Sequence, residues 1–218
     1  MSPHEPHPHH HSGISSKSKL DAPSLLISIG IRPGQVFLDA GAGFGHFSLA
    51  AAPLIGDAGK VYAVDIYAEG MAALRNEAAR LGLRNVETIV ADMTESLPLP
   101  DASVDICLMV NVVHGFVANG ETAAAMGELA RVVKPGGVLA VAEWKKSSPT
   151  GPWSWRRLAR EAKRRLSHVS SLFASGPPQG IRLSADEVAA AVTPFGFRWM
   201  RAEDPNPKHT LVVFERER

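Results

Sequence analysis

The stretch VFLDAGAGFGHF (residues 36–47) decides the fold class. Its first four residues predict a buried strand that ends at Asp39. Gly41, Gly43 and Gly45 follow at alternate positions, and a helix is expected after them. Glycines in such a turn let the backbone pass close under a ligand, and the start of the helix offers N–H groups to an anionic group. A plain strand-to-helix turn would contain the same glycines, so the motif gains weight only from its neighbours.

Short apolar runs alternate with helical segments along the rest of the chain. The run 104–112 is almost entirely apolar, which is typical of a central strand covered on both faces. The last two expected strands are joined by the short stretch around 203–208, which is too short for a helical crossover, so they should pair antiparallel. The expected strands are 36–39, 60–65, 86–91, 104–112, 138–144, 197–202 and 210–214, and the expected helices are 20–31, 45–54, 68–81, 122–133 and 184–195.

This order of elements predicts an α/β fold over residues 20–218. We expect a Rossmann-like, doubly wound, mostly parallel seven-stranded sheet with an antiparallel C-terminal strand. Ser184 and Glu187 have the spacing of a capping box at the start of the last helix.

Residues 1–19 are polar and rich in proline and histidine, and they are predicted to form a flexible tail. Their five histidines are either an incidental tract, which we favour, or ligands for a divalent metal. We expect no other metal site in the chain.

Residues 145–180 contain eight lysines and arginines against one glutamate, and interrupt the alternation. Within them, WSWRRLAREAKRRLSHVSSLFAS (153–175) has apolar residues at helical spacing, which predicts a basic amphipathic helix. Three roles fit this insertion. It could pack on its own domain or in a homodimer, cover the site as a lid that attracts an anionic substrate, or make peripheral membrane contact through 153–173.

The composition excludes several other classes of protein. The net charge of +1 predicts no general attraction to nucleic acid, and no apolar run reaches the ~20 residues of a membrane span. Cys107 is the only cysteine, so no intrachain disulfide can form, and its apolar surroundings predict a buried thiol. No secretory signal pattern stands at the N-terminus, and we therefore expect a cytoplasmic protein.

Two further acidic positions follow predicted strands. Asp65 stands 22 residues after Gly43, close to the offset of ~20 at which a carboxylate reaches the hydroxyls of a ribose. Asp92 follows the third strand, where its carboxylate could accept from an adenine amino group while Met93 covers the ring. All these positions fall at the carboxyl ends of successive strands, where doubly wound sheets bind ligands.

With these features the sequence resembles the class I S-adenosylmethionine-dependent methyltransferases. More narrowly, it is similar to the ubiquinone/menaquinone-biosynthesis-like branch of small-molecule methyltransferases. The similarity covers about residues 20–144 and 182–216, and the matching stretches are DAGAGFG (39–45), VYAVD (61–65), ADM (91–93), VDICLMVNVVHGF (104–116) and ELARVVKPGGVLAVAEW (128–144).

This resemblance implies that S-adenosylmethionine is the cofactor. It implies transfer of a methyl group to a small-molecule acceptor by in-line displacement. An anionic acceptor would suit the basic insertion if its role is that of a lid. The cofactor residues that it implies are Asp39, Gly41, Ala42 and Gly43 at the methionine part, Asp65 with its neighbour Ile66 at the ribose, Asp92 and Met93 at the adenine, and Asn111 near the sulfonium.

His114 and Trp144 are the candidates on the acceptor side. The ordinary pKa of a histidine lies near neutrality, so His114 could take the proton of an acceptor hydroxyl as a catalytic base. A structural hydrogen bond is the alternative role for this histidine. Trp144, at the end of the fifth strand, could contact the substrate or only cover the end of the sheet.

Two other functions are alternatives to methyl transfer. An NAD-dependent oxidoreductase is disfavoured, because Gly45 follows Gly43 by two residues where a dehydrogenase motif has three, and because Asp39 replaces an apolar residue. A non-catalytic S-adenosylmethionine-binding or scaffold protein, acting through its basic helix, would carry the same cofactor motifs.

Overall fold

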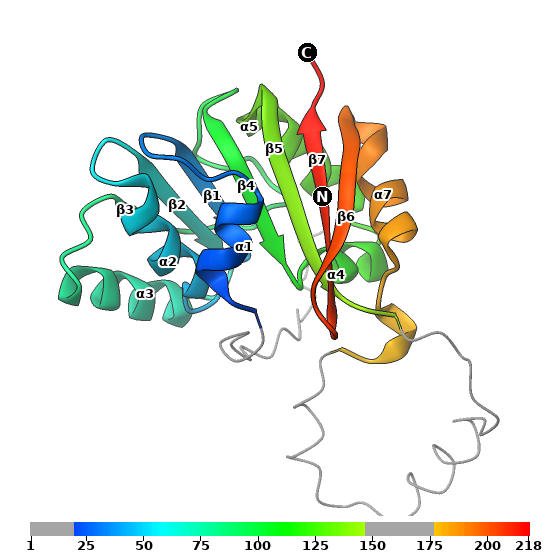
Figure 1. Cartoon of the computed structure of the whole chain (residues 1–218), viewed down its shortest axis with the longest axis horizontal. Helices are drawn as coiled ribbons and strands as arrows, with labels where there is room; N and C mark the ends of the chain where they lie inside the picture. The colour runs from blue at the N-terminus through cyan, green and yellow to red at the C-terminus, as the bar shows by residue number, and fades with distance from the viewer. Residues whose placement is uncertain (1–19, 147–176) are drawn as a thin grey trace, which may run out of the picture.

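Seven strands form one sheet in the computed structural model, in the order β3-β2-β1-β4-β5-β7-β6 (Figure 1). The structure describes residues 20–146 and 177–218. Strands β1 to β5 are parallel, and β7 runs antiparallel between β5 and β6. The predicted doubly wound sheet with an antiparallel C-terminal strand is confirmed. The strands are β1 (Val36–Ala40), β2 (Lys60–Asp65), β3 (Val86–Val90), β4 (Val104–Val110), β5 (Val133–Trp144), β6 (Phe197–Asn206) and β7 (His209–Arg216).

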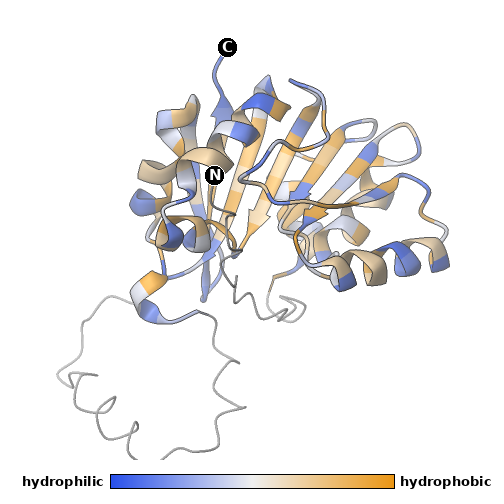
Figure 2. Ribbon diagram, turned by 180° about the vertical axis from the view of Figure 1, so that it is seen from behind, coloured by the Kyte–Doolittle hydropathy of each residue, from blue (hydrophilic) through white to orange (hydrophobic). Residues whose placement is uncertain are grey.

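Helices cover both faces of this sheet (Figure 1). Two apolar clusters lie on opposite faces because successive side chains of a strand alternate. One cluster joins β1, β4 and β5 to α1 and α2, and the other joins the same strands to α5 and α7. In Figure 2 the hydrophobic residues concentrate along the central strands. The α-helices are α1 (Ala22–Ser28), α2 (His46–Ile55), α3 (Ala68–Arg80), α4 (Val113–Asn119), α5 (Thr122–Val132) and α7 (Ala185–Val192), and the short 3-10 helices are η2 (Gln179–Ile181) and η3 (Thr193–Phe195).

Strand β4 is buried on both faces, as its apolar sequence predicted. Ile106 and Leu108 face the cluster with α1 and α2, whereas Cys107 and Met109 face the cluster with α5 and α7. Burial raises the pKa of the Cys107 thiol. The predicted buried thiol is confirmed, and the high pKa makes it unreactive because the thiolate is the nucleophilic form.

The end of β4 differs from the prediction, and the difference bears on the site. The strand ends at Val110, two residues early, and Asn111 adopts a left-handed conformation with φ of +59°. Helix α4 then begins at Val113, although the sequence analysis placed no helix there. The apolar residues 110–113 extend the strand pattern across this break, which is why hydrophobicity alone does not locate it.

Strand β5 begins five residues earlier than predicted. Its first residue, Val133, pairs with Val104. Residues 134–137, which lie between an expected helix and an expected strand, instead belong to β5, and the register of its pairing with β4 shifts there. Gly136 has a φ of +79°, which lets the chain bulge without leaving the sheet.

The C-terminal hairpin is longer than predicted. Strand β6 reaches Asn206 and β7 begins at His209, so only Pro207 and Lys208 connect them. The polar residues 203–206 resemble a loop, but β6 is an edge strand, where Pro205 needs no hydrogen-bonding partner.

The ends of the first helix and of β3 also lie inside the predicted limits, since α1 covers 22–28 and β3 stops at Val90. At the start of α7, the capping box of Ser184 and Glu187 is confirmed, with both reciprocal hydrogen bonds present.

The predicted His-rich tail and the basic amphipathic helix, with its suggested membrane and homodimer contacts, lie outside the described residues. In the two described ranges, none of the helices combines the length and apolar character that crossing a membrane requires.

Candidate functional site

The parallel strands end at one edge of the sheet, and this brings the predicted residues together. Strand pairing places Ala40 beside Val64, Asp65 beside Val90 and Val110 beside Ala142. The loops that follow these residues therefore share the same edge. In the order of the sheet, the edge carries Asp92, Asp65, Gly41 to Gly43, Asn111 and Trp144.

The glycine turn contains two glycines with different reasons for having no side chain. Both have positive φ, +84° at Gly41 and +55° at Gly43. A Cβ at Gly41 would lie 2.4 Å from a methyl group of Val112, so packing within the protein excludes one. A Cβ at Gly43 would meet no atom of the described residues within 4 Å. The space in front of Gly43 is thus open to a ligand.

Asp65 fixes the turn to the next helix. Its Oδ2 accepts a hydrogen bond of 2.8 Å from the N–H of Gly43, and its Oδ1 accepts one of 2.9 Å from the N–H of Tyr67. Asp65 is half-buried, while Ile66 after it is 40% exposed. The predicted ribose-binding carboxylate therefore also has a structural role that its spacing did not reveal.

Asp39 is buried at the end of β1. Its Oδ2 accepts a hydrogen bond of 2.6 Å from the hydroxyl of Ser48 on α2. Burial raises the pKa of Asp39 from 3.8 to about 6, the hydrogen bonds of Ser48 oppose this rise, and the nearby charge of Asp65 adds to it. Two carboxyl groups so placed make this part of the edge attractive to a cation.

Asn111 has a buried polar atom that no described residue satisfies. Its side-chain Oδ1 has no hydrogen-bond partner there, although its backbone N–H donates to the carbonyl of Ala142 at 2.8 Å. An unpartnered buried oxygen is costly, and a ligand that donates to it would remove that cost. The left-handed backbone of Asn111 is a second strained feature at this position.

Asp92 and Met93 lie in the loop after β3. The Oδ1 atom of Asp92 accepts from the backbone N–H and the hydroxyl of Thr94, at 2.8 and 2.7 Å. Met93 is buried and belongs to the cluster that contains α5 and α7. The aspartate is held at the sheet edge by its own loop, whereas the methionine mainly packs inward.

His114 contacts a carboxylate that the sequence analysis missed. Its Nδ1 lies 2.8 Å from Oε2 of Glu143, and its backbone N–H donates to Oε1 of the same residue at 3.1 Å. Glu143 is only 2% exposed. A charged residue in an otherwise apolar central strand was the available signal. Because an ionised carboxylate only accepts, Nδ1 donates, and Nε2 of His114 is left as the acceptor.

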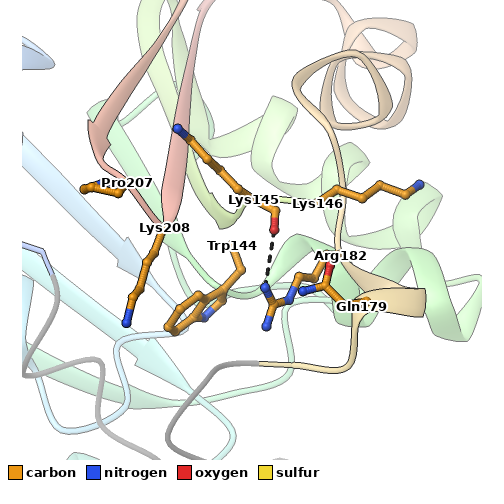
Figure 3. A pocket seen from close by; sticks show the side chains of 7 residues that line it. All are labelled: Trp144, Lys145, Lys146, Gln179, Arg182, Pro207 and Lys208. Carbon is orange, nitrogen blue, oxygen red and sulfur yellow. Dashed lines mark hydrogen bonds between the residues drawn. The ribbon is translucent and has the colours of Figure 1, made fainter. Parts of the chain in front are cut away.

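Trp144 lies beside a pocket of about 420 Å³ at the end of β5 (Figure 3). Its ring packs against His209 with a centroid distance of 4.4 Å, and the guanidinium carbon of Arg182 lies 5.4 Å from the ring centre. The pocket is lined by Trp144, Lys145, Lys146, Gln179, Arg182, Pro207 and Lys208. The sequence indicated Trp144 and the basic residues directly after it, but not Arg182 and Lys208, which come from distant segments.

A metal centre finds no support in the part of the chain that the structure describes. None of the histidine, cysteine and acidic side chains in residues 20–146 and 177–218 form a group of three that could hold an ion.

The chain is similar to known methyltransferases. A family model described as a methyltransferase domain matches residues 37–137. The ubiquinone/menaquinone biosynthesis C-methyltransferase of Hahella chejuensis is 36% identical over 124 residues, which cover 56% of this chain and 47% of that protein. The protein of the same name in Coxiella burnetii is 33% identical over 149 residues, covering 61% of this chain and 57% of its own. The chain spans about half the length of these curated relatives.

The fold is also similar to that of solved methyltransferases. A solved S-adenosylmethionine-dependent methyltransferase from Aquifex aeolicus has a TM-score of 0.72 and 27% identity, with 90% of each chain covered. This match covers more of the chain than the family model, which spans residues 37–137.

Proposed function

We propose that the chain is a class I S-adenosylmethionine-dependent methyltransferase of the ubiquinone/menaquinone-biosynthesis-like branch, and that it methylates a small-molecule acceptor. S-adenosylmethionine supplies a methyl group on a positively charged sulfur, which a nucleophile of the acceptor attacks in line.

The order of residues along the sheet edge is the observation that carries this proposal. From β3 to β4 the edge presents Asp92, then Asp65, then the glycine turn, then Asn111. An elongated ligand with an adenine, a ribose and an amino-acid part can lie across these positions in one extended arrangement. We assign Asp92 and Met93 to the adenine, Asp65 and Ile66 to the ribose, and Asp39, Gly41, Ala42, Gly43 and Asn111 to the methionine part.

The local chemistry fits the cofactor. The open space at Gly43 admits a ligand close to the backbone, and the unpartnered Oδ1 of Asn111 can accept a hydrogen bond from it. The carboxyl of Asp39 is buried near Asp65, so a cationic ligand would stabilise its charged form. S-adenosylmethionine carries an ammonium group and a sulfonium, both of which are cationic.

His114 is proposed as the base that takes a proton from the acceptor. Glu143 holds the ring through Nδ1, which leaves Nε2 to receive the proton, and its negative charge stabilises the imidazolium that forms. Positioning of the two reactants supplies most of the acceleration in such a displacement, so the base adds to the rate without being indispensable.

The acceptor is proposed to be anionic, because basic side chains gather next to the end of β5. The comparisons do not favour the NAD-dependent oxidoreductase. The non-catalytic binding protein differs from the enzyme in turnover alone, so an assay separates them.

The test combines binding and turnover. Calorimetry should give binding of S-adenosylmethionine and of S-adenosylhomocysteine, and no comparable binding of NAD. Incubation with methyl-labelled S-adenosylmethionine and a panel of small phenols, quinols, amines and carboxylic acids should give a labelled product. His114→Gln should slow the transfer while leaving cofactor affinity unchanged. Binding of NAD in preference to S-adenosylmethionine would contradict the proposal.

A further inference from the structure

The pocket beside Trp144 is the strongest feature that the cofactor site does not use. Its lining comes from the end of β5, from the segment around η2 and from the turn between β6 and β7. The backbone N–H of Lys145 donates to the carbonyl of Lys208 at 2.8 Å, which ties the hairpin turn to the end of β5. The volume of about 420 Å³ suits a molecule of one or two rings.

Two of the four cations that line this pocket are paired with carboxylates. Lys145 pairs with Asp204 at 2.6 Å and Lys146 pairs with Glu187 at 2.5 Å. Figure 3 shows both lysine side chains extending away from Trp144. These two positive charges are therefore largely neutralised outside the pocket.

Arg182 and Lys208 are the two cations that flank Trp144. In Figure 3 their side chains lie on either side of the Trp144 ring. The described residues that line the pocket include no carboxylate. Lys208 forms no ion pair with any residue that the structure describes.

Arg182 is also fixed in place. Its Nε donates to the carbonyl of Pro177 at 2.8 Å, and its Nη1 lies 3.4 Å from the carbonyl of Lys145. Partial burial lowers the pKa of Arg182, which means that its positive charge is incompletely solvated. An anion in the pocket would restore that lost solvation, and it would do so in a held, preorganised geometry.

We propose that Arg182 and Lys208, with Trp144 as an apolar wall, bind the acidic group of the methyl acceptor. The ligand class is a small apolar or aromatic molecule with one anionic oxygen group, a carboxylate or a phosphate. The assignment rests on the proposed methyl transfer, since it identifies which part of the acceptor is held. Trp144 directly follows Glu143, the partner of His114, so the pocket and the candidate base meet at the end of one strand.

The test uses three probes that differ in one group: benzoate, phenyl phosphate and neutral benzamide. Their dissociation constants are measured by ligand-observed NMR on the full chain with S-adenosylhomocysteine present, at low and high salt. We expect at least one acid to bind tenfold or more tightly than benzamide at low salt. The tighter of the two acids identifies the anionic group.

Variants then assign the preference to residues. Arg182→Gln should reduce the affinity of the acid about tenfold, to the level of benzamide, and Lys208→Gln should reduce it about threefold and flatten its salt dependence. Arg198→Gln is the matched control, because it removes one arginine charge from the edge strand β6, where Arg198 is paired with Glu215 of β7. Arg182→Lys keeps the charge and should retain part of the preference. The exposed Lys208 keeps the test valid if an Arg182 variant does not fold.

The affinities of the probes decide the proposal. Equal binding of benzamide and the acids, or an acid preference that survives both Arg182→Gln and Lys208→Gln, would overturn it. An acid preference that follows these residues supports it. Failure of S-adenosylmethionine to bind would count against the proposed function and not against the acid-binding pocket, because the two measurements are separate.

Discussion

The two halves of the sheet edge are built in different ways. The half at β1, β2 and β3 is made mainly by backbone, with a turn of positive-φ glycines tied to Asp65 by a main-chain N–H. The half at β5 and β7 is made by side chains, with His114 on Glu143 and Arg182 beside Trp144. A backbone cradle tolerates little change in sequence, whereas a wall of side chains can be replaced residue by residue. The first half therefore suits a ligand common to a family, and the second suits a ligand particular to this protein.

The sharpest way to break the first half is Gly43→Val. The side chain would enter the open space in front of the turn, so S-adenosylmethionine binding should be lost, by at least a hundredfold in calorimetry. The left-handed backbone should cost only about 1–2 kcal/mol of stability. Gly41→Val is the contrasting variant, because its side chain would collide with Val112 and should lower both binding and the melting temperature. If folded Gly43→Val keeps its affinity for S-adenosylmethionine, the cofactor does not lie against the backbone at Gly43.

Asp39→Asn should separate stability from binding. The pKa of Asp39 is about 6 in the folded protein and 3.8 ordinarily, so the folded state binds more protons between these values. The free energy of unfolding contributed by this group then falls as pH rises from about 4 to 6, by about 3 kcal/mol. Asparagine keeps an acceptor for Ser48 and does not ionise.

The protein without cofactor should accordingly be more stable as Asp39→Asn than as the parent at pH 7, and similar at pH 4. Urea unfolding at both pH values measures this, with exposed Asp57→Asn as the control. Cofactor affinity should fall in the same variant, because the carboxylate that attracts the ammonium group is gone. If the difference in stability between Asp39→Asn and the parent is the same at pH 4 and at pH 7, the pKa of Asp39 is not raised in the folded protein.

Asp65→Ala should weaken the cofactor about tenfold to over a hundredfold, because a charge-assisted hydrogen bond contributes roughly 1.5–3 kcal/mol. The variant also loses the bonds to the N–H groups of Gly43 and Tyr67, so some loss of stability is expected. Calorimetry below the melting temperature measures the affinity, with Asp57→Ala as the matched control. A folded variant with parental affinity would remove Asp65 from the ribose site.

Glu143→Gln is the smallest expected effect and probes the second half. The amide would donate to Nδ1 of His114, which moves the ring proton to Nε2 and removes the base. Methyl transfer should slow by about tenfold, while calorimetric affinity for S-adenosylmethionine stays at the parental value. Combining it with His114→Gln should add no further loss. A change in cofactor affinity instead of rate would mean that the pair only supports the fold.

The sequence predicted the first half of the edge better than the second, for physical reasons. Gly41 and Gly43 both have positive φ, a local backbone requirement that favours glycine, and local requirements of this kind are visible in the sequence. The pair of His114 and Glu143 joins residues 29 positions apart, and the pocket joins Trp144 to residues near 182 and 208. Such contacts depend on strand register and on the length of the C-terminal hairpin. Helix α4 was missed for a related reason, since the left-handed turn at Asn111 leaves no mark in the hydrophobic pattern.

The end of β5 sets a length. Glu143 and Trp144 are consecutive, so their side chains point to opposite faces of a strand held by β4 and β7 on its two sides. In the proposed arrangement the base His114 contacts Glu143 and the acid-binding pocket lies at Trp144, so this strand would set the separation between the reacting atom and the anionic group of the acceptor. The distance between these two groups within the acceptor would then decide which of its positions is methylated. Regiochemistry in this protein would be a property of strand geometry, and acceptors with the same groups at a different separation would bind without reacting.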